Sequence, residues 1–169
     1  IGQVLAVGPD RSLVYSTDPP LTYGAGIGDG WLGPWRFMSR GRRPTWSIHT
    51  AAESMRIRWM ENAARSDNSG ELMSARIAAQ DSERPLLLAK NVRQWLEVTP
   101  GRLLAVSNAA GRSVYNRLIL IDEDQRRARW VIDSARDFLR VPGQDEVIVQ
   151  VVHGQAGFDI YRVPIPAGL

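Results

Sequence analysis

The chain of 169 residues contains no cysteine, and this absence excludes disulfide bonds and thiolate metal sites. It does not identify a compartment, because a chain without cysteine fits oxidising and reducing surroundings equally well. Long apolar runs are also missing. None approaches the roughly 18 residues that a membrane-spanning helix needs, so we expect no transmembrane segment. The chain starts at Ile1 with neither methionine nor signal peptide, which is typical of a processed protein or an excerpt of a longer one.

Lysine is nearly absent, since Lys90 is the only one, and the net charge of +3 therefore rests on arginine. The arginines are spread along the chain, with short clusters at 40–43 and 126–129. A nucleic-acid binder usually gathers its positive charge on one face or groove. We therefore expect no nucleic-acid partner.

An internal repeat is the strongest pattern that the sequence does contain. Residues 84–98, RPLLLAKNVRQWLEV, return 43 residues later at 127–141, where Trp95 corresponds to Phe138 and Leu96 to Leu139. A looser match lies 49 residues earlier, with Trp46 at the position of Trp95. Self-similarity at a period of this length is the signature of a repeat architecture.

Short strands follow one another in the same order in both copies of the repeat. Their separators include Pro-Gly at 100–101 and again at 142–143, which is turn chemistry. Only 50–54 offers room for a helical turn, so the predicted class is all-β. The predicted strands are 4–7, 12–16, 35–39, 45–48, 56–60, 71–77, 86–89, 94–98, 103–107, 117–122, 130–132, 137–141, 146–152 and 158–163.

Four-stranded antiparallel units of about 43 residues in series are typical of β-propeller blades. One blade cannot bury both faces alone, whereas stacked blades form a continuous core. We predict one propeller-like domain over 1–169, complete with about four blades, part of a larger ring, or closed by a second chain. Trp46, Trp95 and Phe138 are then equivalent core aromatics between blades. The approximate units are 1–39, 40–89, 90–132 and 133–169. If one chain closes the ring, 1–7 is expected to supply the outer strand of the last unit.

The segments RRPTWS at 42–47, MRIRWM at 55–60 and NSGELM at 68–73 resemble the TolB-like, WD40-like propeller repeat. VTPGRLLAV with NRLILID, and VPGQDEVIV with FDIYRV, are similar to two further repeats. The resemblance covers roughly 35–165 and departs from the repeat at 48–50, where IHT replaces the usual proline-aspartate-glycine turn. It implies a propeller and extracytoplasmic, cell-envelope contacts with other proteins. The predicted location is therefore periplasmic or otherwise extracytoplasmic, although the residues themselves are equally compatible with the cytoplasm.

No catalytic motif accompanies the repeat. His49 and His153 lack a third metal ligand at motif spacing, and neither a serine elbow nor a phosphate-binding loop occurs. Acidic residues at 67–69 and 122–124 sit at predicted turns without the spacing of a calcium loop. We therefore predict a non-catalytic protein without cofactor and without a metal site.

The stretch 17–34, with three prolines and five glycines, is predicted to be the longest loop, and such loops are often functional. Aromatic side chains at its end either form a platform at a binding site or fold back over the sheet. Aromatics and arginine dominate interface hot spots, so this loop and the residues after it are the candidate surface. The candidate binding residues are Tyr23, Asp29, Trp31, Trp35, Arg40, Arg42 and Arg43.

The predicted function is a protein–protein interaction scaffold, which a protein partner, a second chain or a homo-oligomer can engage. One alternative is the propeller domain of a prolyl-oligopeptidase-like serine hydrolase whose catalytic domain is outside these residues. The other is a propeller that binds a glycan or small ligand, which the tryptophans beside the glycine-rich stretch favour.

Overall fold

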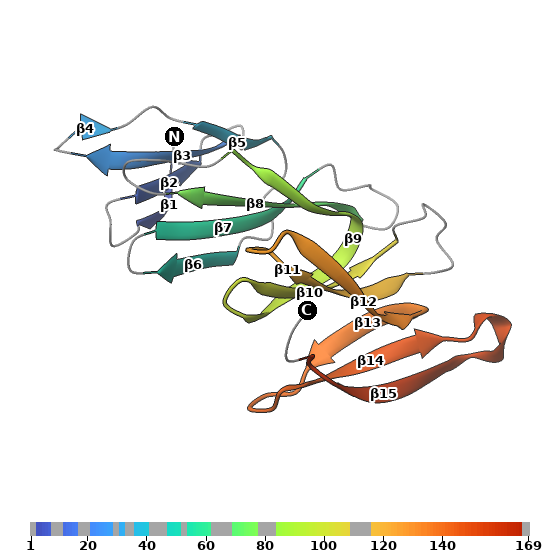
Figure 1. The fold of residues 1–169 in the computed structure, drawn as a ribbon. Helices are drawn as coiled ribbons and strands as arrows, with labels where there is room; N and C mark the ends of the chain where they lie inside the picture. The colour runs from blue at the N-terminus through green and yellow to red at the C-terminus, as the bar shows by residue number, and fades with distance from the viewer. Residues whose placement is uncertain are drawn as a thin grey trace. The chain divides into compact units, whose positions relative to one another are not determined.

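Antiparallel strands account for almost all regular structure in the computed structural model, which describes residues 3–7, 12–16, 21–28, 31–32, 36–40, 47–51, 54–61, 69–77, 84–108 and 116–166 (Figure 1). A single short 3-10 turn, Gly154–Ala156, is the exception, and these residues contain no α-helix. The all-β prediction is confirmed. The chain forms two compact units, residues 1–63 with 71–87, and residues 64–70 with 88–169.

The first unit contains two groups of antiparallel strands. In one group the order is β1-β2-β3, and both β4 and β5 pair with β3. In the other, β7 pairs with β6 on one side and β8 on the other. The strands are β1 (Gln3–Val7), β2 (Ser12–Ser16), β3 (Leu21–Gly28), β4 (Trp31–Leu32), β5 (Arg36–Arg40), β6 (Ser47–Ala51), β7 (Ser54–Glu61) and β8 (Gly70–Ile77).

Two local predictions in this unit were wrong. The glycine-rich stretch is not one long loop, because 21–28 forms the eight-residue strand β3. Glycine weakens a strand through its entropy, but β3 has a hydrogen-bonded neighbour on each side, and this pairing outweighs the propensity. The helical turn at 50–54 is also absent, since Thr50 and Ala51 end β6 and Ser54 begins β7.

The middle of β7 is buried on both faces, because Arg58, between Ile57 and Trp59, is also 0% exposed. Ile57 and Trp59 are two residues apart, lie on the same face and are fully buried. Trp59 satisfies its indole N–H by donating to Oε1 of Glu61 at 2.9 Å. Leu72 on β8 is fully buried too.

The second unit consists of two antiparallel sheets. The first has the order β9-β10-β11-β12 and the second the order β13-β14-β15. The predicted strands over 94–163 are all found, and the Pro-Gly pairs form the expected turns between β9 and β10 and between β13 and β14. The strands are β9 (Leu86–Thr99), whose first two residues belong to the first unit, β10 (Arg102–Ser107), β11 (Arg117–Asp122), β12 (Arg127–Asp133), β13 (Ala135–Arg140), β14 (Glu146–Val152) and β15 (Phe158–Pro164).

The sequence repeat is also a repeat of backbone conformation. Asn91 lies within β9, which runs through the predicted break without interruption, and Ser134 lies 43 residues later between β12 and β13. Both have positive φ, 51° and 54°, in the left-handed region that residues other than glycine rarely adopt. Each is held there by a neighbouring strand, because its carbonyl accepts from a backbone N–H, that of Asn108 or Val152, at 2.9 Å. At Ser134 the chain passes from one sheet to the next, whereas Asn91 lies within the continuous strand β9.

The turn at Gly143 allows a test of how much a positive φ lowers the free energy of unfolding when the residue is not glycine. Its φ is +71°, and a Cβ added there meets no atom within 4 Å. Gly143→Ala is therefore expected to destabilise the protein by about 1 kcal/mol through the backbone alone. Urea unfolding measures the change. Gly143→Asn is the control and should cost less, since asparagine tolerates the left-handed region; equal losses for both variants would contradict this explanation.

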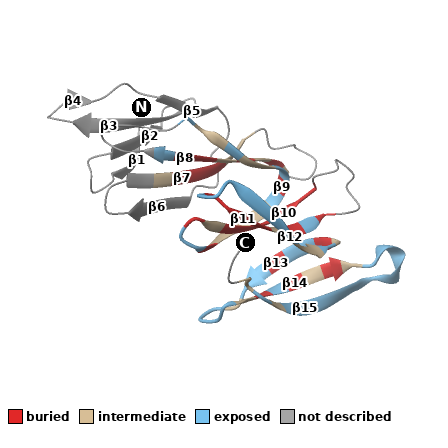
Figure 2. Cartoon of the chain, in the orientation of Figure 1, coloured by how far each residue is buried: buried red, intermediate tan, exposed pale blue. Residues whose placement is uncertain are grey.

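The core of the second unit lies between its two sheets (Figure 2). Phe138 on β13 is 2% exposed and joins a cluster with residues of β10 and β11, while Trp95, its counterpart in the repeat, is half-buried. Trp46 lies outside the described residues. The buried members are Val98, Leu104, Val106, Leu118, Leu120, Ala135, Phe138, Val147, Val149 and Val151.

Candidate functional site

Large apolar side chains are exposed together on one face of the sheet β13-β14-β15. The strand pairing places Leu139 opposite Ile148, and places Phe158 and Ile160 at alternate positions of β15 on the same side. We call this surface the apolar face. Its four members, with their exposed fractions, are Leu139 (69%), Ile148 (37%), Phe158 (57%) and Ile160 (66%).

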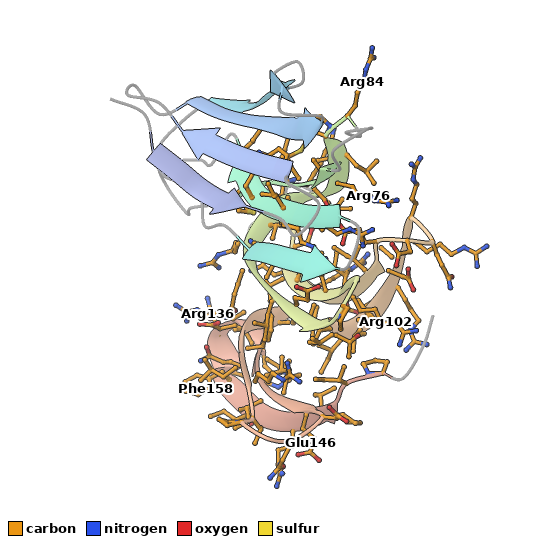
Figure 3. All side chains as sticks on the ribbon, turned by 90° about the vertical axis from the view of Figure 1, so that its left-hand side faces the viewer. Arg76, Arg84, Arg102, Arg136, Glu146 and Phe158 are labelled. Carbon is orange, nitrogen blue, oxygen red and sulfur yellow. The ribbon has the colours of Figure 1, made fainter. Side chains whose placement is uncertain are left out.

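On the opposite side of the sheet, β13 and β14 are packed in the core, whereas six of the seven residues of β15 are exposed. Val147, Val149 and Val151 alternate with Ile148 along β14 and are buried, as is Phe138 next to Leu139. Figure 2 shows β15 exposed along nearly its whole length, and Figure 3 shows Phe158 projecting from it. Exposed apolar side chains that gather on one side of a sheet form a surface suited to a further contact.

Strands β9 to β12 have an equivalent face that is covered. Strand pairing sets Leu96 opposite Leu104 and Leu139 opposite Ile148, so the apolar face has a counterpart in the preceding repeat. There the counterpart residues pack against β13-β14-β15 in the core cluster. The equivalent pairs are Leu96 and Leu139, Leu104 and Ile148, and Leu118 and Ile160, whereas the buried Val106 and Leu120 correspond to the polar Gln150 and Arg162.

The charges on the apolar face nearly cancel. Arg162 donates from Nε to Oε2 of Glu146 at 2.8 Å, across the ladder between β15 and β14. The carboxylate of Asp137 binds the adjacent backbone, since its Oδ1 accepts a hydrogen bond from the N–H of Phe138 at 2.8 Å. One arginine therefore faces two carboxylates on this side of the sheet, and the surface carries little net charge.

A polar cluster occupies the other side of β15. His153 Nε2 lies 3.0 Å from Oδ2 of Asp159, and the Tyr161 hydroxyl donates to the same oxygen at 3.3 Å. All three side chains are exposed. The negative charge of Asp159 raises the pKa of Tyr161 above its usual 10.0, with smaller contributions from desolvation and from the hydrogen bond. The phenol of Tyr161 is therefore kept in its neutral form as the pH rises.

Replacing Asp159 with asparagine is expected to lower the pKa of Tyr161 toward its ordinary value. The raised pKa means that the neutral, hydrogen-bonded phenol is retained as the pH rises and is lost only above the raised value. Ultraviolet absorbance of tyrosine ionisation measures the shift between the wild type and Asp159→Asn. Tyr161→Phe is the control that identifies which of the four tyrosines moves. Superimposable titration curves for the wild type and Asp159→Asn would contradict the assignment.

A shallow hollow of about 340 Å³ lies at the turns that end β9 and β11. Asp122 lines it but is committed to the turn, because Oδ1 accepts the backbone N–H of Gln125 at 2.9 Å and Oδ2 lies 3.7 Å from Nε of Arg102. Within the part of the chain that the structure describes, no three acidic or histidine side chains converge on a cation position.

The predicted binding residues fall largely where side chains are not described. The backbones of Tyr23, Trp31 and Arg40 lie in β3, β4 and β5, and β3 pairs with both of the others. Asp29, Trp35, Arg42 and Arg43 lie outside the described residues. Their role as a binding surface stays a prediction.

The apolar face was missed in the sequence, although the repeat contains the signal. Leu139 was recognised as the counterpart of Leu96, but the pattern is the same whether or not a following sheet covers it. No helix in the described ranges is long and apolar enough to cross a membrane. Comparisons with protein families, curated proteins and solved structures find no match to this chain.

Proposed function

We propose that this protein is a non-catalytic protein–protein interaction scaffold of the β-propeller type, which acts outside the cytoplasm in the cell envelope. The observation that carries the interaction role is the apolar face, where four large side chains are exposed on one side of a sheet. Apolar side chains that are exposed side by side often mark an interaction site.

The propeller architecture is supported by the way the second unit is built. Strands β9 to β12 and strands β13 to β15 follow the repeat, have the same unusual backbone conformation at Asn91 and Ser134, and pack face to face over a common core. Serial stacking of this kind is the property that propellers share. The extracytoplasmic location rests on the resemblance to TolB-like repeats.

Capture of partners by immobilised protein tests the scaffold function. The wild type and Ile160→Glu are exposed to the same envelope extract, and bound proteins are quantified by mass spectrometry. Ile160 is 66% exposed, so the variant is expected to fold normally while placing a charge in the contact. Tyr161→Gln is the matched control, because its position is on the same strand but on the opposite face. Identical sets of captured proteins from wild type and Ile160→Glu would count against the proposal.

A further inference from the structure

We propose that the outer edge of β12 is a docking site for an extended acidic segment of a partner protein, which pairs with β12 as an additional strand. The inference rests on the proposed function, since it takes the protein to be an interaction scaffold. It goes further by assigning a second surface, on a different sheet from the apolar face, and by naming the chemistry of the segment that this surface binds.

β12 is the outermost strand of its sheet, because within the described residues it pairs only with β11. The following strand, β13, belongs to a different sheet, so this edge stays open although the chain continues. The first four residues of β12, from Arg127 to Trp130, are all exposed (Figure 2). Their pairing with β11 is regular and shifts only beyond Trp130. The outward backbone N–H and C=O groups of this short stretch can therefore pair with another chain.

Positive charge lines one side of this edge. Arg129 pairs with the buried Leu120 of β11, and Arg127 is two residues away, so both side chains lie on the same side of the strand. Both are exposed, as is Arg126 in the preceding turn. In the described part of the chain, none of these three guanidinium groups has an ion pair or a hydrogen bond. A carboxylate of an incoming strand can therefore bind them without displacing an internal partner.

An aromatic side chain lies on the other side of the edge. Trp130 is 53% exposed, and Cζ of Arg117 lies 4.1 Å from the centre of its ring. Arg117 is in turn held by Asp133, since its Nε donates to Oδ1 at 3.1 Å. This contact orients the indole, so that less conformational freedom is lost when a ligand packs on it. Tryptophan and arginine are also the residues that most often dominate the binding energy of interfaces.

The two sides of β12 together define the pattern of the segment. In an extended strand, successive side chains point to opposite faces. A strand paired with β12 therefore presents every second residue to Arg127 and Arg129, and the residues in between to Trp130. The matching segment alternates acidic with apolar residues. A nucleic acid is also negatively charged, but it has no peptide groups to pair with the edge, and three arginines are few against the charge density of its backbone.

Fluorescence anisotropy with two labelled heptapeptides of identical composition tests the proposal. The peptide EIEIEIE alternates glutamate with isoleucine, whereas EEEEIII separates them into blocks. We expect the full chain to bind the alternating peptide at least about fivefold more tightly than the block peptide. Only the alternating peptide brings its carboxylates to the arginine side of the edge and its apolar side chains to the tryptophan side.

Reversal of the charges at the edge should remove most of this binding. The double variant Arg127→Glu/Arg129→Glu is expected to bind the alternating peptide at least about tenfold more weakly, and Trp130→Ala at least about fivefold more weakly. The double variant Arg136→Glu/Arg140→Glu is the matched control, because it changes the net charge equally at two exposed arginines of β13. It should change the affinity by less than about threefold. Circular dichroism verifies that each variant is folded.

Three results would overturn the docking site: no binding of the alternating peptide to the wild type at millimolar protein, equal binding of the two peptides, or equal losses in the two double variants. The arginines would then only protect the edge from aggregation. Tighter binding of single-stranded oligodeoxythymidine than of the alternating peptide would overturn the choice of a polypeptide.

The outcomes also separate this inference from the proposed function. Ile160→Glu lies on a different sheet and should bind the alternating peptide as the wild type does. Loss of peptide binding in Arg127→Glu/Arg129→Glu with unchanged capture by Ile160→Glu would contradict the role of the apolar face and support the edge of β12. The reverse result would support the apolar face and overturn the docking site on β12.

Discussion

Replacing Phe138 with alanine is expected to lower the free energy of unfolding of the second unit by about 3–5 kcal/mol. Phe138 is 2% exposed and lies in the core between the two sheets of this unit. Truncation removes the apolar surface that the ring buries and leaves a cavity that neighbouring strands, fixed by their ladders, fill only in part. Since a domain of this size is stable by roughly 5–15 kcal/mol, the loss is a large fraction of the total.

Leu139→Ala is the matched control for this experiment. Leu139 is the next residue along β13 but points to the opposite side and is 69% exposed. Its truncation should change stability by less than about 0.5 kcal/mol when measured on dilute, monomeric protein. Urea unfolding monitored by circular dichroism gives both values. Similar losses for the two variants would mean that the buried and exposed sides of β13 have been assigned wrongly.

Removing the amide of Gln94 is the second change with a large expected effect. Its two hydrogen bonds to the backbone of Phe138 connect the first strand of one sheet with the first strand of the next. Gln94→Met keeps the length of the side chain but can neither donate nor accept in this way. We expect a loss of about 1–3 kcal/mol, because the backbone groups of Phe138 lose a bonded partner in a partly buried place.

Gln150→Met provides the comparison for Gln94→Met. Gln150 is also a half-buried glutamine on a strand, but it belongs to β14 and lies on the apolar face rather than in the contact between the sheets. The expected change is within about 0.5 kcal/mol. Equal midpoints of urea unfolding for Gln94→Met and the wild type would show that the amide does not stabilise the contact between the sheets.

The sequence was informative where local chemistry and the repeat agreed. Pro100 and Gly101, and again Pro142 and Gly143, marked turns because proline limits φ and glycine accepts its positive values. It was misleading for β3, where glycine content indicated a loop. Pairing with β2 and β5 makes this segment a strand, and the sequence of the segment alone does not reveal which strands lie beside it.

The candidate site was beyond prediction for a related reason. Leu96 and Leu139 occupy the same position of the repeat, yet one packs against the core and the other is exposed. What differs is the presence of a covering sheet, which is a property of the assembly and not of the residue. A repeat pattern therefore predicts which face is apolar but not which copy of that face stays open.

The backbone conformation shared by Asn91 and Ser134 bears on how such a chain can lengthen during evolution. The segment between them begins and ends in the same unusual backbone conformation, with φ of 51° and 54°. Tandem duplication of the corresponding gene segment would thus insert one four-stranded repeat whose two ends have matching backbone conformations. Selection on the new repeat can then act on its exposed side chains alone, because the duplicated segment already has the backbone conformation that connects it to its neighbours.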